Sequence, residues 1–193
     1  MKTSANINEV ALAADQAARQ EIEKYGLPSL FHYDLSMEKA VYLAKKTNAN
    51  EALVRIGLAL MDIKLGQAFS EKRGPAHVAM SVEYAKDFLS KYNLSEEEVA
   101  IIINCVEAHH GKIPFSSIEA EVCANADCYR FMHPKGVLYY LTTLAKRGGD
   151  FSAQLTQLEA KYDEKASILS LPAAKKELDA YGKAIKSIIA ASK

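Results

Sequence analysis

Four of the five histidines in this chain fall in a single order with two aspartates. Imidazole and carboxylate groups are the side chains that hold a hydrolytic divalent metal ion in proteins. The order spreads these residues over several predicted helices, which could bring the side chains together at the centre of a bundle. The candidate metal ligands, in chain order, are His32, Asp62, His77, His109, His110 and Asp127.

The two aspartates lie in unusually apolar surroundings. Asp62 ends the run IGLALMDI, and Asp127 lies within VCANADCYRF. A carboxylate buried on such a face without a partner is costly, so each aspartate needs a polar group or a cation nearby. Two such aspartates, together with several histidines, are better explained by a shared metal centre than by separate structural roles.

The elements that must position these residues are helices. The hydrophobic periodicity predicts an all-α protein with no strand and no repeat. His32 lies just before the second predicted helix, Asp62 near the end of the third, and His77 at the start of the fourth. Capping boxes, Ser95 with Glu98 and Ser116 with Glu119, open the next two. The predicted helices span about 6–25, 34–47, 49–66, 75–92, 95–110, 116 to beyond 127, 136–147, 151–168 and 173–191.

The length suits one domain with a full core. We expect an N-terminal helix over 1–27, a helical domain over 28–149, and a C-terminal helical extension over 150–193 packed on the same domain. The extension has no histidine and carries ordinary charged residues. It is therefore interpreted as a layer for packing or for homo-oligomer formation, without a direct part in function.

The composition excludes several classes of protein. Lys plus Arg and Asp plus Glu both number 24, so the balanced charge gives no signal for a nucleic-acid partner. The N-terminus has no continuous apolar stretch, which argues against a signal peptide or a membrane anchor. The three cysteines lie in apolar helical patterns and are expected to be buried free thiols, as in a cytoplasmic protein. These cysteines are Cys105, Cys123 and Cys128.

From His32 to about Asp127 the chain resembles the HD-domain metal-dependent phosphohydrolases. The resemblance rests on five fragments in order, namely HYDLSMEKA, LALMDI, AHVAMSVEYA, VEAHHG and SSIEAEVCANAD. It implies a helical bundle of HD-domain type with extra C-terminal helices. It also implies a divalent metal ion (Mn, Fe, Ni, Zn or Mg) that activates water against a small phosphorylated or nucleotide-like substrate.

The resemblance further implies two metal positions. His32, Asp62 and Asp127 would hold the first. His77 and one or both of His109 and His110 would complete the second, with Asp62 bridging the two positions and acting in catalysis.

Met61 stands where the resemblance calls for the histidine of a His-Asp dyad. A thioether is a poor ligand for hard or borderline cations, so the first position has lost a donor. We therefore expect Met61→His to raise metal occupancy.

Three functions remain open from the sequence. The first is a metal-dependent phosphohydrolase, favoured by the survival of the other histidines and both aspartates. The second is a degenerate HD module with little or no activity that regulates by binding, favoured by Met61. The third is a structural bundle whose polar groups satisfy one another. Five basic residues near the ligand segments could bind phosphate but are each interpreted as surface charges: Lys64, Lys72, Arg73, Lys112 and Arg130.

Overall fold

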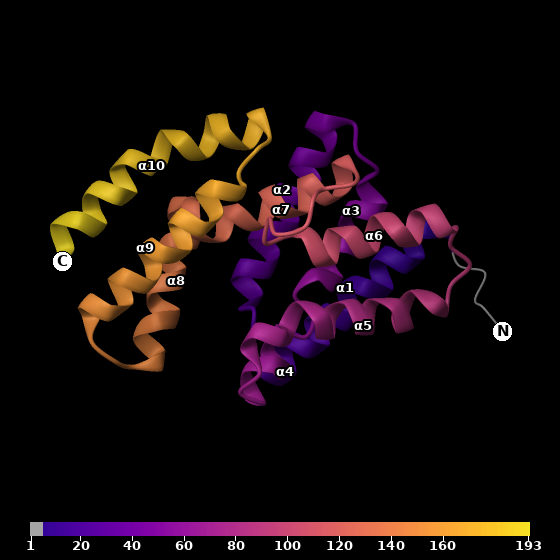
Figure 1. Ribbon diagram of the computed structural model, residues 1–193, viewed down its shortest axis with the longest axis horizontal. Coiled ribbons are helices and arrows are strands. Elements are labelled where there is room, and N and C mark those ends of the chain that lie inside the picture. The colour runs from indigo at the N-terminus through magenta and orange to yellow at the C-terminus, as the bar shows by residue number, and fades with distance from the viewer. Residues whose placement is uncertain (1–5) are drawn as a thin grey trace.

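The computed structural model describes residues 6–193, and within that range the chain is all-α, as predicted (Figure 1). Residues 1–5 of the predicted N-terminal segment lie outside the described residues. The elements are α1 (Ile7–Tyr25), α2 (Leu30–Thr47), α3 (Glu51–Met61), α4 (Leu65–Ser70), the short 3₁₀ helix η1 (Gly74–Ala76), α5 (His77–Ser90), α6 (Glu96–Ala108), α7 (Ile118–Met132), α8 (Pro134–Arg147), α9 (Phe151–Ile168) and α10 (Pro172–Ser192). None of the described helices combines the length and apolar character needed to cross a bilayer.

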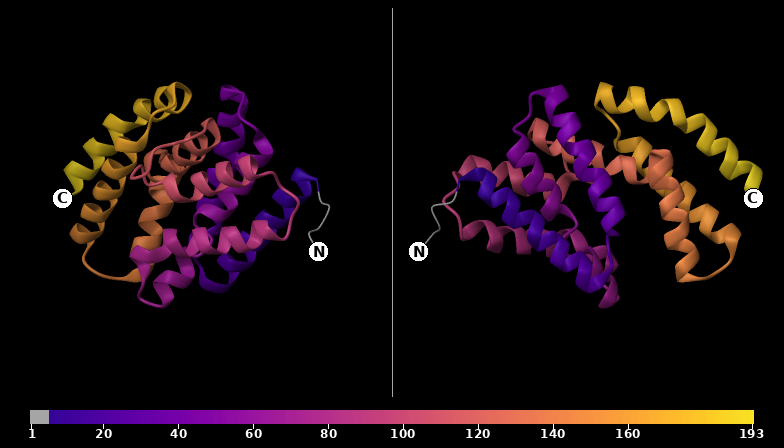
Figure 2. Two further views of the ribbon diagram at one scale, coloured as in Figure 1. Left: turned by 45° about the vertical axis from the view of Figure 1, so that its right-hand side comes forward. Right: turned by 180° about the vertical axis from the view of Figure 1, so that it is seen from behind.

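Helix α7 forms the centre of the molecule. It packs against α2, α3, α6, α8, α9 and α10, and its side chains are buried on every face from Ala120 to Met132, apart from the half-buried Glu121. In the views of Figures 1 and 2, α8, α9 and α10 stay together on the side opposite α1 and α5, and α2 and α7 lie between these groups. A polar side chain on α7 is therefore enclosed by helices from both halves of the chain.

Close contact between α3 and α6 depends on a glycine. A Cβ atom at Gly57 of α3 would lie 2.5 Å from Cβ and 2.7 Å from Sγ of Cys105 on α6. The absent side chain lets the two helices approach more closely than any other residue would allow. Cys105, Cys123 and Cys128 are free and buried, which confirms the prediction for the thiols.

Helix ends follow local capping signals where the chain offers them. The predicted capping box of α6 is confirmed, because Ser95 and Glu98 each accept the other's backbone N–H. The second predicted box is wrong. Ser117, rather than Ser116, caps α7, and the Glu119 carboxylate accepts the backbone N–H of Asn50 at 2.9 Å.

Two further boundaries differ from the prediction and both concern the candidate site. Ser29 caps α2, so the helix begins four residues earlier than expected and His32 lies in its first turn. The predicted helix over 49–66 is interrupted, because α3 ends at Met61 and Asp62 takes a non-helical conformation (φ −116°, ψ 16°). The break places Asp62 at a turn that is held by a hydrogen bond from Lys64 N to Ser81 Oγ of α5.

Candidate metal centre

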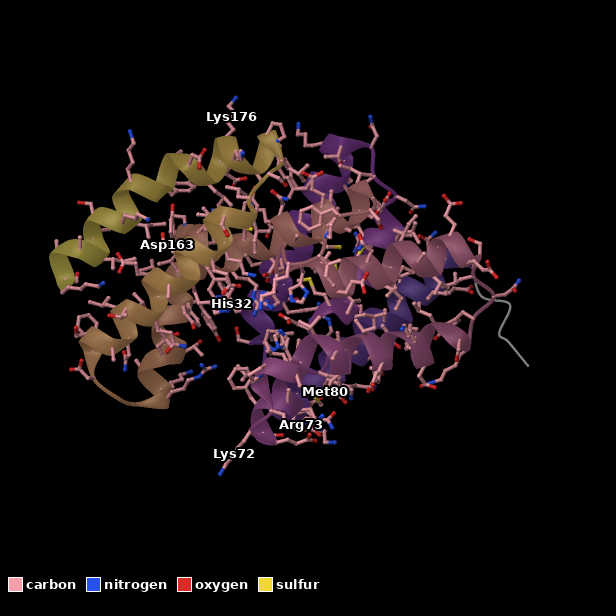
Figure 3. All side chains as sticks on the ribbon, in the orientation of Figure 1. His32, Lys72, Arg73, Met80, Asp163 and Lys176 are labelled. Atoms are coloured by element: carbon pink, nitrogen blue, oxygen red, sulfur yellow. The ribbon has the colours of Figure 1, made fainter. Side chains whose placement is uncertain are left out.

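The structure brings the candidate ligands into one place. Five of the six line a single cavity of about 180 Å³: His32, Asp62, His77, His110 and Asp127. The sixth, His109, lies just behind, fully buried, with its ring centroid 4.2 Å from that of His110. Figure 3 shows His32 in the interior of the molecule, whereas Lys72 and Lys176 project outward from its surface. The expected convergence of residues from α2, α3, α5, α6 and α7 is therefore observed.

Three imidazoles are oriented in the same way. Nδ1 of His77 donates to the Gly74 carbonyl at 2.8 Å, and Nδ1 of His109 donates to the Val106 carbonyl at 2.7 Å. Nδ1 of His110 lies 2.9 Å from the carboxylate of Glu164, which can only accept. Each hydrogen bond places the proton on Nδ1 and leaves a lone pair on Nε2, which is how metal-binding histidines are commonly fixed.

The three Nε2 atoms face a common point. Nε2 of His77 lies 3.1 Å from Nε2 of His110, a distance at which two lone pairs repel unless a cation or a proton lies between them. Nε2 of His109 is buried and, among the described residues, has no hydrogen-bond partner. The ligand atoms of His77, His109 and His110 all lie within 4.8 Å of one another, a spacing that could hold a metal ion.

Asp62 supplies a fourth donor to this group. Its Oδ1 lies 3.6 Å from Nε2 of His77 and 3.5 Å from Nε2 of His109. Three imidazole nitrogens and one carboxylate oxygen match the four-coordinate sets that bind zinc and other first-row divalent metals. Both His109 and His110 place a ring nitrogen in this group, although neighbouring residues on a regular helix point about 100° apart, because α6 ends at Ala108 and His109 is its C-cap.

The aspartates at the other side of the cavity are already paired. Nη1 of Arg130 lies 2.6 Å from Oδ2 of Asp62 and 2.7 Å from Oδ1 of Asp127. Arg130 is only 7% exposed. The interpretation of Arg130 as a surface charge was therefore wrong, because the guanidinium is drawn inward by two buried carboxylates. Its position three residues after Asp127 on α7, on the same helical face, is the sequence signal that could have revealed the pair.

A second cation comes from the C-terminal extension. Nζ of Lys165 on α9 lies 2.7 Å from Oδ2 of Asp127, and the side chain is 1% exposed. Its neighbour Glu164 accepts from His110. The expectation that this extension carries only ordinary solvated charges was thus wrong, because α9 packs directly on α7 and places Lys165 and Glu164 beside the candidate ligands. Lys165 continues the buried stripe of Leu158 and Tyr162, a pattern visible in the sequence.

His32 and Met61 complete the surroundings of the aspartates. Nε2 of His32 donates to the Gly136 carbonyl at 3.0 Å, which leaves Nδ1 as its only available metal donor. Met61 is 2% exposed and lines a small internal pocket with Ser36 and Arg130. Within the described chain, neither Oγ of Ser36 nor Nε of Arg130 has a hydrogen-bond partner.

Electrostatics keep the carboxylates ionised. Burial alone would raise the pKa of Asp62, but the Arg130 guanidinium at 2.6 Å outweighs it and holds that pKa well below its usual range. Burial is likewise outweighed at Asp127 by Lys165 and Arg130, so its pKa is also strongly lowered. Burial and the charge of Arg130 lower the pKa of His32 to about 4, so this imidazole is neutral at pH 7.

The remaining cavity wall is basic on one side and apolar on the other. Arg147 and Lys161 join Arg130 and Lys165 along it, and Leu27, Pro28, Leu65 and Phe69 form part of the apolar wall. Of the other basic candidates, Lys64 pairs with Glu21, whereas Lys72, Arg73 and Lys112 are exposed, as expected. The cations that line the cavity therefore come from α7, α8 and α9.

Two known proteins resemble the chain in sequence. No family model matches the chain. Two curated proteins match, the ribonuclease Y of Campylobacter curvus at 28% identity over 123 residues and that of Finegoldia magna at 32% over 110 residues. These matches cover 64% and 57% of this chain but only 22% and 20% of the relatives, so the chain spans about a fifth of their length.

Two solved structures share the arrangement of helices at 18% identity. A predicted HD superfamily hydrolase from an uncultured Thermotogales bacterium superimposes with a TM-score of 0.59, covering 82% of this chain and 88% of its own. The chain therefore shares the all-α fold of that structure. Bacillus subtilis YpgQ, solved in complex with ADP, gives a TM-score of 0.64 over 93% of both chains.

Proposed function

We propose that this protein is a metal-dependent phosphohydrolase of the HD type that holds a divalent ion with His77, His109, His110 and Asp62. The observation that carries the proposal is the convergence of three Nε2 lone pairs, each fixed by a hydrogen bond at Nδ1, on one side of an open cavity. Without a cation or an added proton, the 3.1 Å contact between His77 and His110 is repulsive.

A bound divalent ion would supply a Lewis acid that makes water acidic enough to ionise near neutral pH and that withdraws charge from phosphoryl oxygens. The protein's own residues provide the rest. Oδ1 of Asp62 would bind the ion together with the three imidazoles, while Arg130 donates a hydrogen bond to Oδ2 and so holds the carboxylate in place. Glu164 orients His110 and increases the basicity of its Nε2.

The substrate would be a small molecule with at least one phosphoryl group. Arg147, Lys161 and Arg130 line the cavity that contains His77 and His110, so a phosphate there would meet both positive charge and the metal. The known proteins are consistent with this class. YpgQ was solved with ADP, and the sequence relatives are named as ribonucleases, which act on phosphodiesters.

Turnover of defined phosphate compounds in the presence of Mn²⁺ tests the proposal. Bis(4-nitrophenyl) phosphate and ADP serve as a phosphodiester and a phosphoanhydride. We expect metal-dependent hydrolysis of at least one of them, abolished in His77→Ala and retained in His133→Ala, since His133 lies outside the cavity wall. A protein that binds Mn²⁺ but hydrolyses neither compound would contradict the hydrolase.

A degenerate regulatory module is the second candidate, and a specific observation favours it. Arg130 binds both aspartates that the first metal position would use. In that case the same cavity would bind a phosphorylated ligand without turnover. Equilibrium binding of ADP that persists in the absence of hydrolysis, and that is lost in Lys161→Ala, would support this module.

A further inference from the structure

We infer that the guanidinium of Arg130 takes the place of the first metal ion, so that the site binds one divalent ion rather than two. The inference rests on the proposed function for the second position, and it concerns the half of the site that contains Asp62 and Asp127. It assigns to Arg130 the neutralising and phosphate-binding roles that an ion would have there.

The first argument is steric. A metal ion shared by Asp62 and Asp127 would lie about 2.0–2.2 Å from one oxygen of each carboxylate. Nη1 of Arg130 already lies between those carboxylates, 2.6 Å from one and 2.7 Å from the other. An ion at bonding distance from both oxygens would collide with this nitrogen. The ion could enter only if the Arg130 side chain left the space.

The second argument is charge. Asp62 and Asp127 together carry two negative charges, and Arg130 and Lys165 supply two positive charges at 2.6–2.7 Å from their oxygens. All four side chains are at most 10% exposed. Because excess charge in such a dry setting is costly, this half of the site is complete without an ion. A divalent ion added in this dry half would place two more positive charges beside Arg130 and Lys165, whereas at the histidine position it would adjoin the open cavity, with Glu164 2.9 Å from His110.

The third argument concerns the donors around the guanidinium. Met61 provides no ligand for a hard ion, and Nε2 of His32 is committed to the Gly136 carbonyl. Met61 and Arg130 line the same small pocket. Met61 and Arg130 thus lie together where an ion would need donors, and the tethered cation of Arg130 takes the role that a ligated ion would have there.

The guanidinium also faces the cavity, where its donors could meet a phosphoryl oxygen. Arg130 lines the same cavity as His77 and His110. A guanidinium is planar, permanently charged and well matched to phosphate oxygens. It would thus hold the substrate beside the single metal ion, on the side where a second ion would otherwise have done so.

The test counts bound Mn²⁺ after equilibrium dialysis of the purified full chain. Wild type should bind one ion per chain. Met61→His should also bind one, because Arg130 still fills the position, in contrast to what the sequence alone predicts. The double variant Met61→His/Arg130→Ala should bind two, and its electron paramagnetic resonance spectrum should show two magnetically coupled Mn²⁺ ions. Met61→His/Arg130→Lys keeps the cation and should bind one.

Two ions in the wild type, or one ion in the wild type and still only one in a folded Met61→His/Arg130→Ala variant, would overturn the inference. If that variant does not fold, the wild-type count still decides, since two ions exclude a closed first position and one ion supports it. A wild type that binds none, beside a double variant that binds one, would remove the proposed metal-dependent function but support the role of Arg130. The two proposals therefore fail through different results.

Discussion

The two halves of the site share Asp62 but satisfy its two oxygens in opposite ways. On one side, Oδ2 meets Arg130, and the ion pairs extend through Asp127 to Lys165 with every charge matched. On the other side, Oδ1 faces Nε2 of His77 and Nε2 of His109 at 3.6 and 3.5 Å. We call the first the closed half, because ion pairs neutralise its charges, and the second the open half, where we propose that an ion binds. The comparison shows that one carboxylate can be satisfied by an ion pair at one oxygen while its other oxygen remains available as a ligand.

Removal of a cation from the closed half should give the largest loss of stability. Lys165→Met leaves Asp127 with a single partner in a fully buried setting and should lower the free energy of unfolding by about 3–5 kcal/mol. Urea denaturation measures the change. The control is Lys186→Met on α10, whose ion pair with Asp163 is half exposed and should contribute less than about 1 kcal/mol. Equal losses in the two variants would refute a special role for the buried pair.

The open half should respond to metal rather than to mutation alone. Mn²⁺ at one hundred times its dissociation constant should stabilise the wild type by about 2.7 kcal/mol, because the ion binds only the folded chain. Thermal unfolding with and without a chelator measures the gain. His77→Ala should lose it, whereas His133→Ala, which removes the fifth histidine, should keep it. A gain that survives in His77→Ala would place the ion elsewhere.

Loss of the contact between Glu164 of α9 and His110 of the open half should have a smaller effect, which is on metal affinity. Glu164→Gln removes the carboxylate that accepts from Nδ1 of His110. Metal affinity should fall about 10- to 100-fold, as is usual when such a supporting partner is lost. Isothermal titration with Zn²⁺ measures it. Glu159→Gln, on the same helix but paired with the terminal residue Lys193, should leave the affinity unchanged. Equal affinities for wild type and Glu164→Gln would count against the orienting role.

The loss of stability at acidic pH tests the ion pairs of the closed half with a smaller expected effect. The pKa of Asp127 is lower in the folded state than its usual value near 4, so the native chain binds fewer protons than the unfolded chain. Stability is therefore full above about pH 4 and falls as the pH drops below it, by up to about 1.4 kcal/mol per pH unit for this carboxylate. Asp127→Asn should be less stable at pH 7 but show a shallower slope between pH 4 and 3. Parallel slopes would contradict the assignment.

Local patterns predicted much of the fold. The bounds of α9 agree with the predicted helix over 151–168, because its periodicity and its terminal signals are contained in the segment itself. The pair Ser95 and Glu98 likewise acts within one turn. Glu119 behaves differently, since its carboxylate serves a backbone N–H 69 residues earlier in the chain. The packing of α7 on the start of α3 determines this partner, so a local sequence pattern cannot predict it.

The same difference between local patterns and long-range contacts decides which residues of the candidate site the sequence could predict. Histidines and aspartates could be recognised by residue type and order, and the five lining residues share one cavity. Arg130 was interpreted as a surface charge, and Glu164 and Lys165 were missed, because arginine, glutamate and lysine on helices are usually solvated. Their role depends on α9 lying against α7, a contact between segments far apart in the sequence. A basic residue that falls on a stripe of buried apolar residues, as Lys165 does, is the sequence signal that indicates a buried ion pair.

The contact between Gly57 and Cys105 has a consequence for the spacing of ligands. These residues lie on the helices that lead to Asp62 and to His109, so the closeness of α3 and α6 sets how far the carboxylate stands from the imidazole. A methyl group at position 57 would meet Cys105 at 2.5 Å and force the helices apart. Metal sites tolerate errors of only about 0.2 Å. Gly57 and Cys105, which are not among the candidate ligands, thus set the spacing of those ligands, and a substitution there would change the affinity of the proposed site while leaving every ligand in place.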